Sequence, residues 1–494
     1  MQHSTTKPSL FDALTPIVIL CSLLAAAVSF FGDGSSSGPN QIALLFSGGV
    51  AIIIGLKNGF TWSDLESSII KGISLALGAV LILLAVGSLI GTWLLAGTVP
   101  SMIYYGIGLL EPSVFYAACC VICAIVALSI GSSWTVAATI GVALIGVAKG
   151  LELSETITAG AIISGAYFGD KMSPLSDTTN LAPAVAGTDL FTHIRYMAIT
   201  AVPSFVITLA LFVMIGLNQE AQQSSGNMDL ILNGLNDNFH IHWTMLAPLL
   251  VTLALAVKKV PAFPAVCIGA LFGGVWAILF QQETILNLAA AGTPSVTANV
   301  VVVWGALFDG ISVDTGNASL DSLLSGGGMS SMLNTVWLIM SAMTFGAVME
   351  KIGLLKKLVE SLLKAVKGTG SLISTTIVTA FGTNVLTADQ YISIVMPGRM
   401  FKEEFQERGL APENLSRALE DGGTITSPLV PWNTCGAYMH SVLLVNPLDY
   451  FMYCFFNLIS PMLGMIVATV GFKVRYLVKK PEQENMIAAQ SPAR

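Results

Sequence analysis

The chain is built from long apolar runs separated by short polar stretches. Leu14–Phe31, Ile73–Leu95, Met197–Leu217 and Phe451–Phe472 come close to or exceed the roughly 20 residues that an α-helix needs to cross a bilayer. The first run resembles the core of a signal peptide, but it lacks a clear small-residue cleavage site and a second apolar run follows at once. We therefore predict an all-α polytopic membrane protein that keeps its first helix.

Composition supports the membrane setting. Of the 494 residues, 54% are hydrophobic and only 10% are charged, whereas soluble domains average about 25% charged residues. No basic patch suggests a nucleic-acid partner, so the expected surroundings are the lipid bilayer. Cys119, Cys120 and Cys123 lie on an apolar stretch without His or acidic neighbours. We interpret them as buried thiols rather than as a metal site or disulfides.

One polar segment interrupts the apolar pattern. Ala166–Asn180, reading AYFGDKMSPLSDTTN, follows the apolar run Thr156–Ile163 and holds two carboxylates, a lysine and several hydroxyl side chains. Pro174 prevents a regular helix through it. A charged side chain at the bilayer centre costs roughly 2.5–3.5 kcal/mol, and non-helical backbone is tolerated there only inside protein or beside a water-filled cavity. We therefore predict that this segment belongs to the functional site of a transporter.

The distribution of Lys and Arg predicts the orientation in the membrane. The connection Gly32–Asn40 and the polar link 218–242 contain neither residue, whereas the segments before the first helix and after the last one do. We expect both termini in the cytoplasm and the link on the outside. The predicted division is a first transmembrane repeat at 1–217, the extracytoplasmic link at 218–242, a second repeat at 243–475 and a cytoplasmic tail at 476–494.

Three short motifs recur in the same order on both sides of the link. They are LFSGGVAIII and LFGGVWAILF (Leu45–Ile54 and Leu271–Phe280), IGSSWT and FGTNVL (Ile130–Thr135 and Phe381–Leu386), and SPL (Ser173–Leu175 and Ser427–Leu429). The spacing requires an insertion in the second half, around Gln281–Leu333. Gly97–Pro112 has no Lys or Arg, but its counterpart Gly353–Gly368 has four Lys. Equivalent segments therefore lie on opposite sides of the membrane, which is typical of inverted-topology repeats with broken or re-entrant helices.

Four helix breaks are predicted, two in each half: Gly131–Thr135, Asp170–Asn180, Gly382–Asp389 and Glu420–Thr434. Unwound backbone offers free carbonyl oxygens, and Ser, Thr, Asn and Asp add the oxygen ligands that a hard cation such as Na⁺ prefers. The carboxyl-terminal ends of half-helices add negative dipole. A buried carboxylate can also hold either Na⁺ or a proton, and that competition suffices for exchange.

The candidate carboxylates differ in how well a role other than ion binding fits them. Asp177 is the preferred site residue, with an N-cap role for the next helix as the alternative. Asp170 fits two interpretations equally well: a residue of the site, or the partner of Lys171 in an ion pair at the membrane edge. Asp389 lies in an apolar context that favours function. Glu420–Asp421 fits a site and a cytoplasmic loop equally well.

The segment Ala166–Met197 resembles the NhaC family of Na⁺/H⁺ antiporters. The motif GDKxSPLSDTTN followed by GxDLFxHI carries the resemblance, and SPLVPWNTCG at Ser427–Gly436 agrees with it. The family implies two inverted repeats and an elevator-like movement of a transport domain against a scaffold. The resemblance assigns cation or substrate binding to Asp170, Ser173, Asp177, Thr178 and Asn180, and in the second half to Thr426, Ser427, Trp432, Asn433 and Thr434. Asp177, Asn180 and Asn433 are the expected Na⁺ ligands.

The substrate has alternatives. Members of the family resemble simple Na⁺/H⁺ antiporters, malate–lactate exchangers or amino acid transporters. A carboxylate substrate needs an Arg, a Lys or free backbone N–H groups, and Lys171, Arg399 and Gly382–Asn384 are the candidates, with both cations expected near the cytoplasmic edge. His193 and Arg195 are expected to anchor a helix at the interface.

We expect a secondary antiporter of the bacterial inner membrane, not an enzyme, with Na⁺ and H⁺ as transported ions and no cofactor. The sequence leaves open whether a small carboxylate or an amino acid is also carried, and whether the protein forms a homodimer. The alternative hypotheses from other functional classes are an intramembrane protease and a channel.

Overall fold

The computed structural model describes residues 6–218, 225–364 and 366–477, and these residues are almost entirely helical. They contain no β-strand, only two isolated bridges, Ile311–Gly326 and Leu410–Tyr476. Within them, seven helices are long and apolar enough to cross a membrane, or nine if each bent pair counts as one span. The prediction of an all-α polytopic membrane protein is confirmed. Most of the predicted tail, 476–494, lies outside the described residues.

The first half, up to the 218–242 link, contains ten α-helices. They are α1 (Leu10–Phe31), α2 (Pro39–Lys57), α3 (Trp62–Leu95), α4 (Thr98–Leu109), α5 (Phe115–Ile130), α6 (Ser133–Val136), α7 (Val142–Gly150), α8 (Glu155–Met172), α9 (Asp177–Ala186) and α10 (Leu190–Asn218). A π-helical turn, η2 (Ala137–Gly141), joins α6 to α7. The helix α11 (Ser225–Asn238) lies in the link.

The second half holds the remaining helices. They are α12 (Ala247–Val257), α13 (Ala262–Phe280), α14 (Gln282–Leu288), α15 (Ser295–Phe308), α16 (Ala318–Leu324), α17 (Leu333–Lys351), α18 (Leu354–Leu363), α19 (Thr369–Thr387), α20 (Gln390–Glu407), α21 (Pro412–Leu419), α22 (Thr434–Leu443), α23 (Pro447–Tyr450) and α24 (Phe455–Val470). A π-helical turn, η5 (Glu420–Thr424), continues α21, and the short 3₁₀ turn η6 (Ser427–Leu429) holds the second SPL motif.

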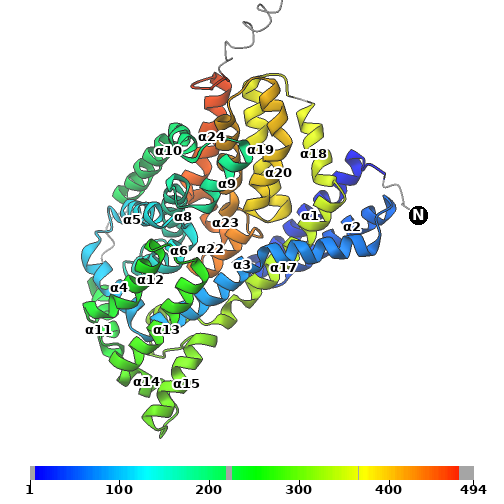
Figure 1. The fold of residues 1–494 in the computed structure, drawn as a ribbon. Helices are drawn as coiled ribbons and strands as arrows, with labels where there is room; N and C mark the ends of the chain where they lie inside the picture. The colour runs from blue at the N-terminus through cyan, green and yellow to red at the C-terminus, as the bar shows by residue number, and fades with distance from the viewer. Residues whose placement is uncertain (1–5, 219–224, 365, 478–494) are drawn as a thin grey trace, which may run out of the picture.

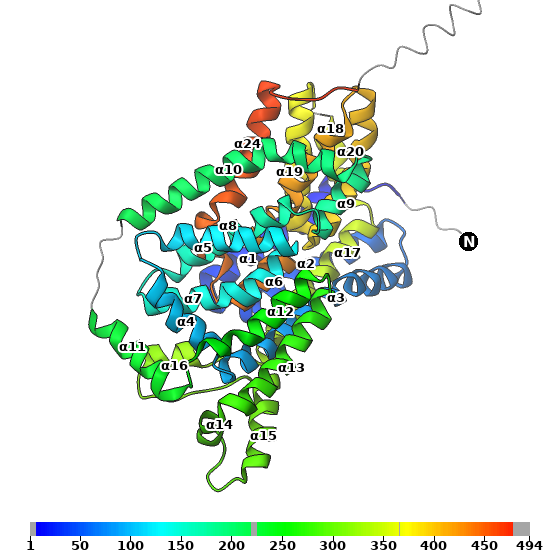
Figure 2. The same cartoon turned by 60° about the vertical axis from the view of Figure 1, so that its left-hand side comes forward.

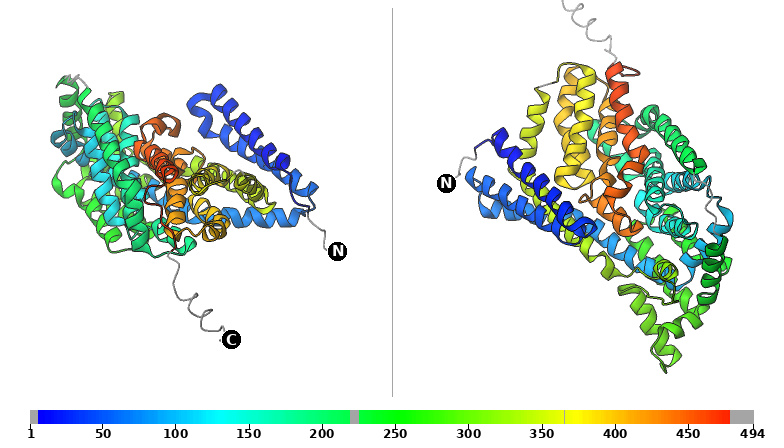
Figure 3. Two further views of the ribbon diagram at one scale, coloured as in Figure 1. Left: turned by 90° about the horizontal axis from the view of Figure 1, so that it is seen from above. Right: turned by 180° about the vertical axis from the view of Figure 1, so that it is seen from behind.

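The helices form two groups that lie side by side. The long helix α3 packs against α13, α15 and α17, and the hairpin of α1 and α2 packs beside α17. The second group is a bundle in which α5 packs on α8, while α19 packs on α20, α21 and α24 (Figure 1). Seen from above, the dark-blue hairpin of α1 and α2 stands apart from the cyan and green helices of the bundle (Figure 3). Both halves of the chain contribute to each group.

The bundle repeats the same local structure in both halves. Three pairs of helix ends lie 257 positions apart, namely Gly131 and Ala388, Ser132 and Asp389, and Gly187 and Leu444. Gly131 and Ala388 both end a helix in the left-handed backbone region, with φ of 77° and 58°. Close packing repeats as well, because a Cβ on Gly165 would lie 2.1 Å from the Cys120 carbonyl oxygen, and one on Gly422 would lie 2.3 Å from that of Ile377.

The two halves are inverted with respect to each other. The short helices α4 and α18 both follow a left-handed glycine, Gly97 and Gly353. In Figures 1 and 2, α18 lies in the upper part of the molecule and α4 lies lower, on the opposite side. The helices α14, α15 and α16 occupy the stretch between α13 and α17 where the insertion was predicted. The two inverted-topology repeats are thus confirmed, whereas the proposed boundaries at 217, 242 and 475 stay predictions.

One predicted break, Gly382–Asp389, is shorter than expected. The helix α19 runs without interruption through Gly382–Asn384 and ends at Thr387, so the break lies at Ala388 and Asp389. The polar side chains do not disturb the helix, because the Thr383 hydroxyl donates to the carbonyl of Thr379 one turn back at 2.8 Å. The counterpart of Gly131 is therefore Ala388 and not Gly382. The backbone N–H groups of Gly382–Asn384 belong to a helix and do not form an anion site.

Candidate functional site

The first break lies beside the SPL loop of the same half. Gly131 ends α5, and a Cβ there would lie 2.6 Å from the carbonyl carbon of Leu175, so the loop approaches closer than any other residue type allows. Ser132 caps the next helix by accepting a hydrogen bond from the Thr135 backbone N–H at 3.2 Å. As expected around Pro174, α8 ends at Met172 and α9 begins at Asp177.

Asp170 projects from α8 onto this break. Its Oδ2 accepts hydrogen bonds from the Ser133 backbone N–H at 3.1 Å and from the Ser133 hydroxyl at 2.7 Å. Asp170 is buried, and among the described residues its Oδ1 has no hydrogen-bond partner. The Ser176 hydroxyl and the Asp177 carboxylate lie within interaction range. A buried carboxylate with one free oxygen is a suitable ligand for a small cation or a proton.

The second half has an uncharged version of the same contact. Ser427 and Gln390 lie 257 positions after Asp170 and Ser133. The Ser427 hydroxyl approaches Gln390 Oε1 at 3.4 Å and donates to the Thr424 carbonyl at 2.7 Å. The repeat therefore places a carboxylate at this position in the first half alone.

Three other predicted residues of the first half hold the loop in shape. The Ser173 hydroxyl donates to the Leu128 carbonyl at 2.8 Å, which ties the loop to the end of α5. Asn180 donates through Nδ2 to the carbonyls of Pro174 and Ser176, at 3.0 and 2.6 Å. The Thr178 hydroxyl lies 3.2 Å from that of Ser176. Asn180 is exposed, whereas Ser173 and Thr178 are buried.

Asp177 lies between two clefts. One of its carboxylate oxygens accepts from the Thr178 backbone N–H at 2.9 Å, and the other accepts from the Tyr391 hydroxyl of α20. Asp177 lines a cleft of about 440 Å³ between the first break and the ends of α12 and α13. Tyr391 lines a larger cleft of about 870 Å³ between α3, α17, α18 and α20. The hydrogen bond between Asp177 and Tyr391 therefore joins the two halves where the two clefts approach each other.

The second break is held by Asn384, a residue expected in unwound backbone. Asn384 Nδ2 donates to the Gly423 carbonyl and, at 3.0 Å, to the Thr426 hydroxyl. Asn433 Nδ2 donates to the Asn384 side-chain oxygen at 3.1 Å, and Asn433 Oδ1 caps α22 by accepting from the Cys435 N–H at 3.0 Å. The second-half loop is thus bound to the end of α19.

Three further contacts complete the second break. The Trp432 indole N–H donates to the Val385 carbonyl at 2.7 Å, and the Thr434 N–H donates to the Ala388 carbonyl at 2.9 Å. Val385 lies 257 positions after Leu128, which accepts from Ser173 in the first half. Asp389 is buried and caps α20 by accepting from the Ile392 N–H at 2.9 Å. The hydrogen bond that Asp389 makes in the described residues is therefore that of a helix N-cap, and Ser132 has the same role at the equivalent position.

The predicted site residues form two groups. Asp170, Ser173, Asp177, Thr178 and Asn180 surround the first break, and Asp389, Thr426, Ser427, Asn433 and Thr434 surround the second. In the described part of the chain no hydrogen bond links Asn433 to Asp177 or Asn180, the three expected Na⁺ ligands. Their shared role in Na⁺ binding stays a prediction.

A buried ion pair joins the halves at a place that the sequence did not indicate. Lys171 of α8 forms an ion pair with Asp421 of η5, and neither side chain is exposed to solvent. The Ser460 hydroxyl of α24 donates to the same carboxylate at 2.9 Å. The expectation that Lys171 lies at the membrane edge as a partner of Asp170 is wrong. The loop interpretation of Glu420–Asp421 is also wrong, because both residues are wholly buried in the bundle.

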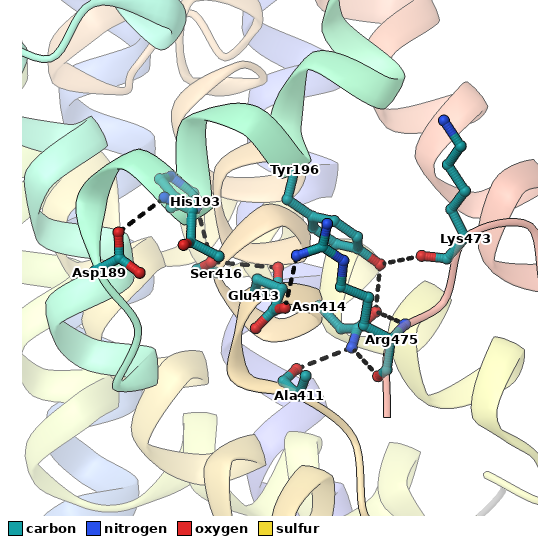
Figure 4. A network of polar contacts seen from close by, with 10 residues as sticks. Asp189, His193, Tyr196, Ala411, Glu413, Asn414, Ser416, Lys473 and Arg475 are labelled. Carbon is teal, nitrogen blue, oxygen red and sulfur yellow. Dashed lines mark hydrogen bonds and ion pairs between the residues drawn. The ribbon is translucent and has the colours of Figure 1, made fainter. Parts of the chain in front are cut away.

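A polar network extends from this region along α21 (Figure 4). The ring of His193 on α10 bonds to the Ser416 hydroxyl at 2.8 Å, and the Tyr196 hydroxyl bonds to Asn414 and to the Lys473 carbonyl. Arg475 forms an ion pair with Glu413 at 3.2 Å. His193 is buried in this network rather than anchored at the membrane interface, while Arg195 is exposed.

The pair Lys171–Asp421 links residues that are 250 positions apart, which no local pattern reveals. The one signal was the Gly422–Gly423 pair after Glu420–Asp421. It marks close helix packing, because a Cβ on Gly422 or Gly423 would crowd α19 or α20.

Comparison with known proteins agrees with this architecture. Residues 165–472 match the model of the Na⁺/H⁺ antiporter family. The chain belongs to the Na⁺/H⁺ antiporter family. The match begins just before Asp170 and ends after α24, so it spans the second break, both SPL loops and the Lys171–Asp421 pair, while the first break at Gly131 precedes it.

Its relatives in the family differ in what their names say they carry. The chain is 38% identical to the Na⁺/H⁺ antiporter NhaC of Alkalihalophilus pseudofirmus, over 86% of this chain and 89% of that protein. It is 35% identical to the malate-2H⁺/Na⁺-lactate antiporter of Bacillus subtilis, over 95% and 96%. It is also 35% identical to the arginine/ornithine antiporter ArcD of Halobacterium salinarum, over 99% and 97%.

Proposed function

We propose that this protein is a secondary antiporter that exchanges Na⁺ for H⁺, with Asp170 as the residue that both ions use. The observation that carries the proposal is the free Oδ1 of the buried Asp170 at a helix break. Ser133 holds the other carboxylate oxygen through two hydrogen bonds, so the free oxygen has a fixed direction. The names of the NhaC relatives support the choice of Na⁺ and H⁺.

The chemistry of exchange follows from the surroundings of Asp170. The α5 helix ends at Gly131, so its carboxyl-terminal dipole lies at the break and favours a cation. Na⁺ and a proton compensate the same negative charge, so the presence of one disfavours the other. Each ion is then carried in turn. Asp177 is the second carboxylate within reach and adds to the attraction for a cation.

The bond between Asp177 and Tyr391 is proposed as a gate between the two clefts. It connects α9 of the bundle to α20 at the border of the larger cleft. Because Asp177 is exposed, the bond can open at modest cost. A gate of this kind keeps the site accessible from one side at a time. We further propose a location in the bacterial inner membrane with both termini in the cytoplasm, and a transport role without enzymatic activity.

A second candidate substrate is a small organic anion. The larger cleft is lined by Lys71, Lys351, Lys356 and Arg399, with Glu350 as its acidic residue. Its volume of about 870 Å³ lies within the range of about 300–1,000 Å³ found for small-molecule sites, which is more space than Na⁺ needs. Co-transport of a carboxylate would make use of this basic lining.

The test is a transport assay with purified protein in liposomes that contain a pH-sensitive dye. We expect external Na⁺ alone to drive proton movement. Malate, lactate, arginine and ornithine are then supplied in turn, with and without Na⁺. Proton movement that needs one of these compounds, and does not occur with Na⁺ alone, would replace Na⁺/H⁺ exchange by the organic-substrate alternative.

A further inference from the structure

Glu420 is a buried carboxyl group that the proposed exchange at Asp170 does not use. It lies in η5, the π-helical turn that continues α21, and its side chain has no exposed area. Among the described residues neither of its carboxylate oxygens has a hydrogen-bond partner. The Thr424 hydroxyl approaches the carboxyl group without forming a hydrogen bond of good geometry. Such a group is far too costly to keep ionised without compensation, so it holds a proton when no cation is near.

The charged groups that face Glu420 come from two elements. Lys171 and Asp170 approach from α8, and Asp421 is its neighbour on η5. Lys171 is already paired with Asp421, so it does not compensate a second carboxylate fully.

Among the other elements packed against η5, α21 carries the buried Arg417, whose guanidinium lies 4.4 Å from the centre of the Tyr196 ring, and Glu413, which is paired with Arg475. Neither of the described helices α19 and α24 contains an ionisable residue. The helix α20 meets η5 through Ser393 and Ile394. The ionisable residue of α9 is Asp177, which is exposed and bonded to Tyr391.

The repeat indicates that packing does not require a carboxylate at this place. The position equivalent to Glu420, 257 residues earlier, is Ile163 of α8, which is wholly buried as well. An apolar side chain therefore fills the corresponding place in the first half. A buried carboxyl group that the fold does not need suggests a functional role.

We propose that Glu420 is a separate proton-carrying residue, coupled electrostatically to the cation site at Asp170. This inference rests on the proposed Na⁺/H⁺ exchange. When Asp170 is ionised and empty, its negative charge favours the protonated form of Glu420. When Na⁺ binds at Asp170, that charge is neutralised, and the ionised form of Glu420 becomes less unfavourable. Na⁺ binding on one side therefore promotes proton release from Glu420, and Na⁺ release promotes proton uptake.

The polar network of α21 gives the proton a direction to leave. Ser416 and His193 follow Glu420 toward the start of α21, then Asn414 and Tyr196, and the series ends at the pair Glu413–Arg475. Arg475 is half exposed and follows the end of α24, so the network reaches the surface there.

The experiment compares Glu420→Gln with Glu404→Gln in liposomes, because Gln has nearly the shape of a protonated Glu. Glu404 is the control, since it lies on α20 outside the proposed proton route and forms an ion pair with Arg408 at 2.6 Å. Two fluxes are measured for each protein. One is Na⁺-driven proton movement over a range of pH, and the other is the exchange of radioactive Na⁺ for unlabelled Na⁺, which requires no proton.

We expect Glu420→Gln to keep Na⁺/Na⁺ exchange within about twofold of wild type and to move about half as many protons per Na⁺, because the proton carried by Asp170 remains and the one carried by Glu420 is lost. Glu404→Gln is expected to match wild type in both fluxes. An unchanged proton-to-Na⁺ ratio and pH profile in Glu420→Gln would overturn the inference. Loss of Na⁺/Na⁺ exchange together with proton movement would overturn it too, because Glu420 would then belong to the cation site or to the fold. If wild type shows no Na⁺-driven proton movement, the proposed function fails, independently of the variant.

Discussion

The exchange of Gly131 for Ala tests whether the first helix break has the geometry described above. Gly131 has φ of 77°, and the left-handed region costs a residue with a Cβ about 1–2 kcal/mol. The new Cβ would also lie 2.6 Å from the Leu175 carbonyl carbon and 2.7 Å from the Ser176 nitrogen, both backbone atoms that have little room to move. Overpacking of this kind costs about 1–3 kcal/mol. The expected loss of stability is therefore about 2–5 kcal/mol.

The matched control is Gly382→Ala. Gly382 lies inside α19, and a Cβ there would have no heavy atom within 4 Å. Replacement of a helical Gly by Ala stabilises by about 0.5–1 kcal/mol. Thermal unfolding of both purified variants in detergent measures the difference, and Na⁺-driven proton movement shows its effect on transport. We expect Gly131→Ala to melt lower and to transport at least about tenfold more slowly, because displacement of Ser133 from Asp170 disturbs the site. Equal melting of Gly131→Ala and wild type, or damage by Gly382→Ala, would refute the reasoning.

Two other predictions concern contacts between the halves. Lys171→Met leaves the buried Asp421 without its ion-pair partner and should destabilise the fold by about 3–5 kcal/mol. The double variant Lys171→Met with Asp421→Leu should recover most of that loss. Thermal melting in detergent distinguishes the two variants, and an equally unstable double variant would contradict the role of the pair. Tyr391→Phe removes the donor to the exposed Asp177 and should weaken the gate by about 1 kcal/mol, or about fivefold in its closed population. Passive Na⁺ leak through liposomes measures this, and an unchanged leak would show that the bond does not close a path.

Features set by local chemistry could be predicted from the sequence. Apolar runs of bilayer length predicted the helical membrane fold, and Pro174 predicted the interruption between α8 and α9. The recurrence of SPL and the reversal of charge between the segments of α4 and α18 predicted inverted repeats, although the SPL motifs lie 254 positions apart and so differ by three residues from the offset of 257 that the structure shows. The first two signals depend on residues that are near each other along the chain, and the repeat signals compare the composition of short segments.

Features set by tertiary contacts could not be predicted. Glycine and polar residues look alike in a break and in a packed helix, which explains the error at Gly382–Asn384. The burial of Lys171, Glu420 and Asp421 depends on α8, η5 and α24 coming together, and an adjacent pair of acidic residues in a sequence fits a loop equally well. The preference for Asp177 over Asp170 likewise could not anticipate that Asp177 is exposed while Asp170 is buried with a free oxygen.

The central claim is that Asp170 carries Na⁺ and H⁺ in turn. The most direct measurement is Na⁺-driven proton movement by Asp170→Asn in liposomes, beside wild type and the exposed control Asp449→Asn. Asn keeps the size of the side chain but has no charge for either ion to neutralise. The account predicts that Asp170→Asn moves no protons in response to Na⁺ at any pH, while Asp449→Asn matches wild type. Exchange by Asp170→Asn at the wild-type rate would contradict the account.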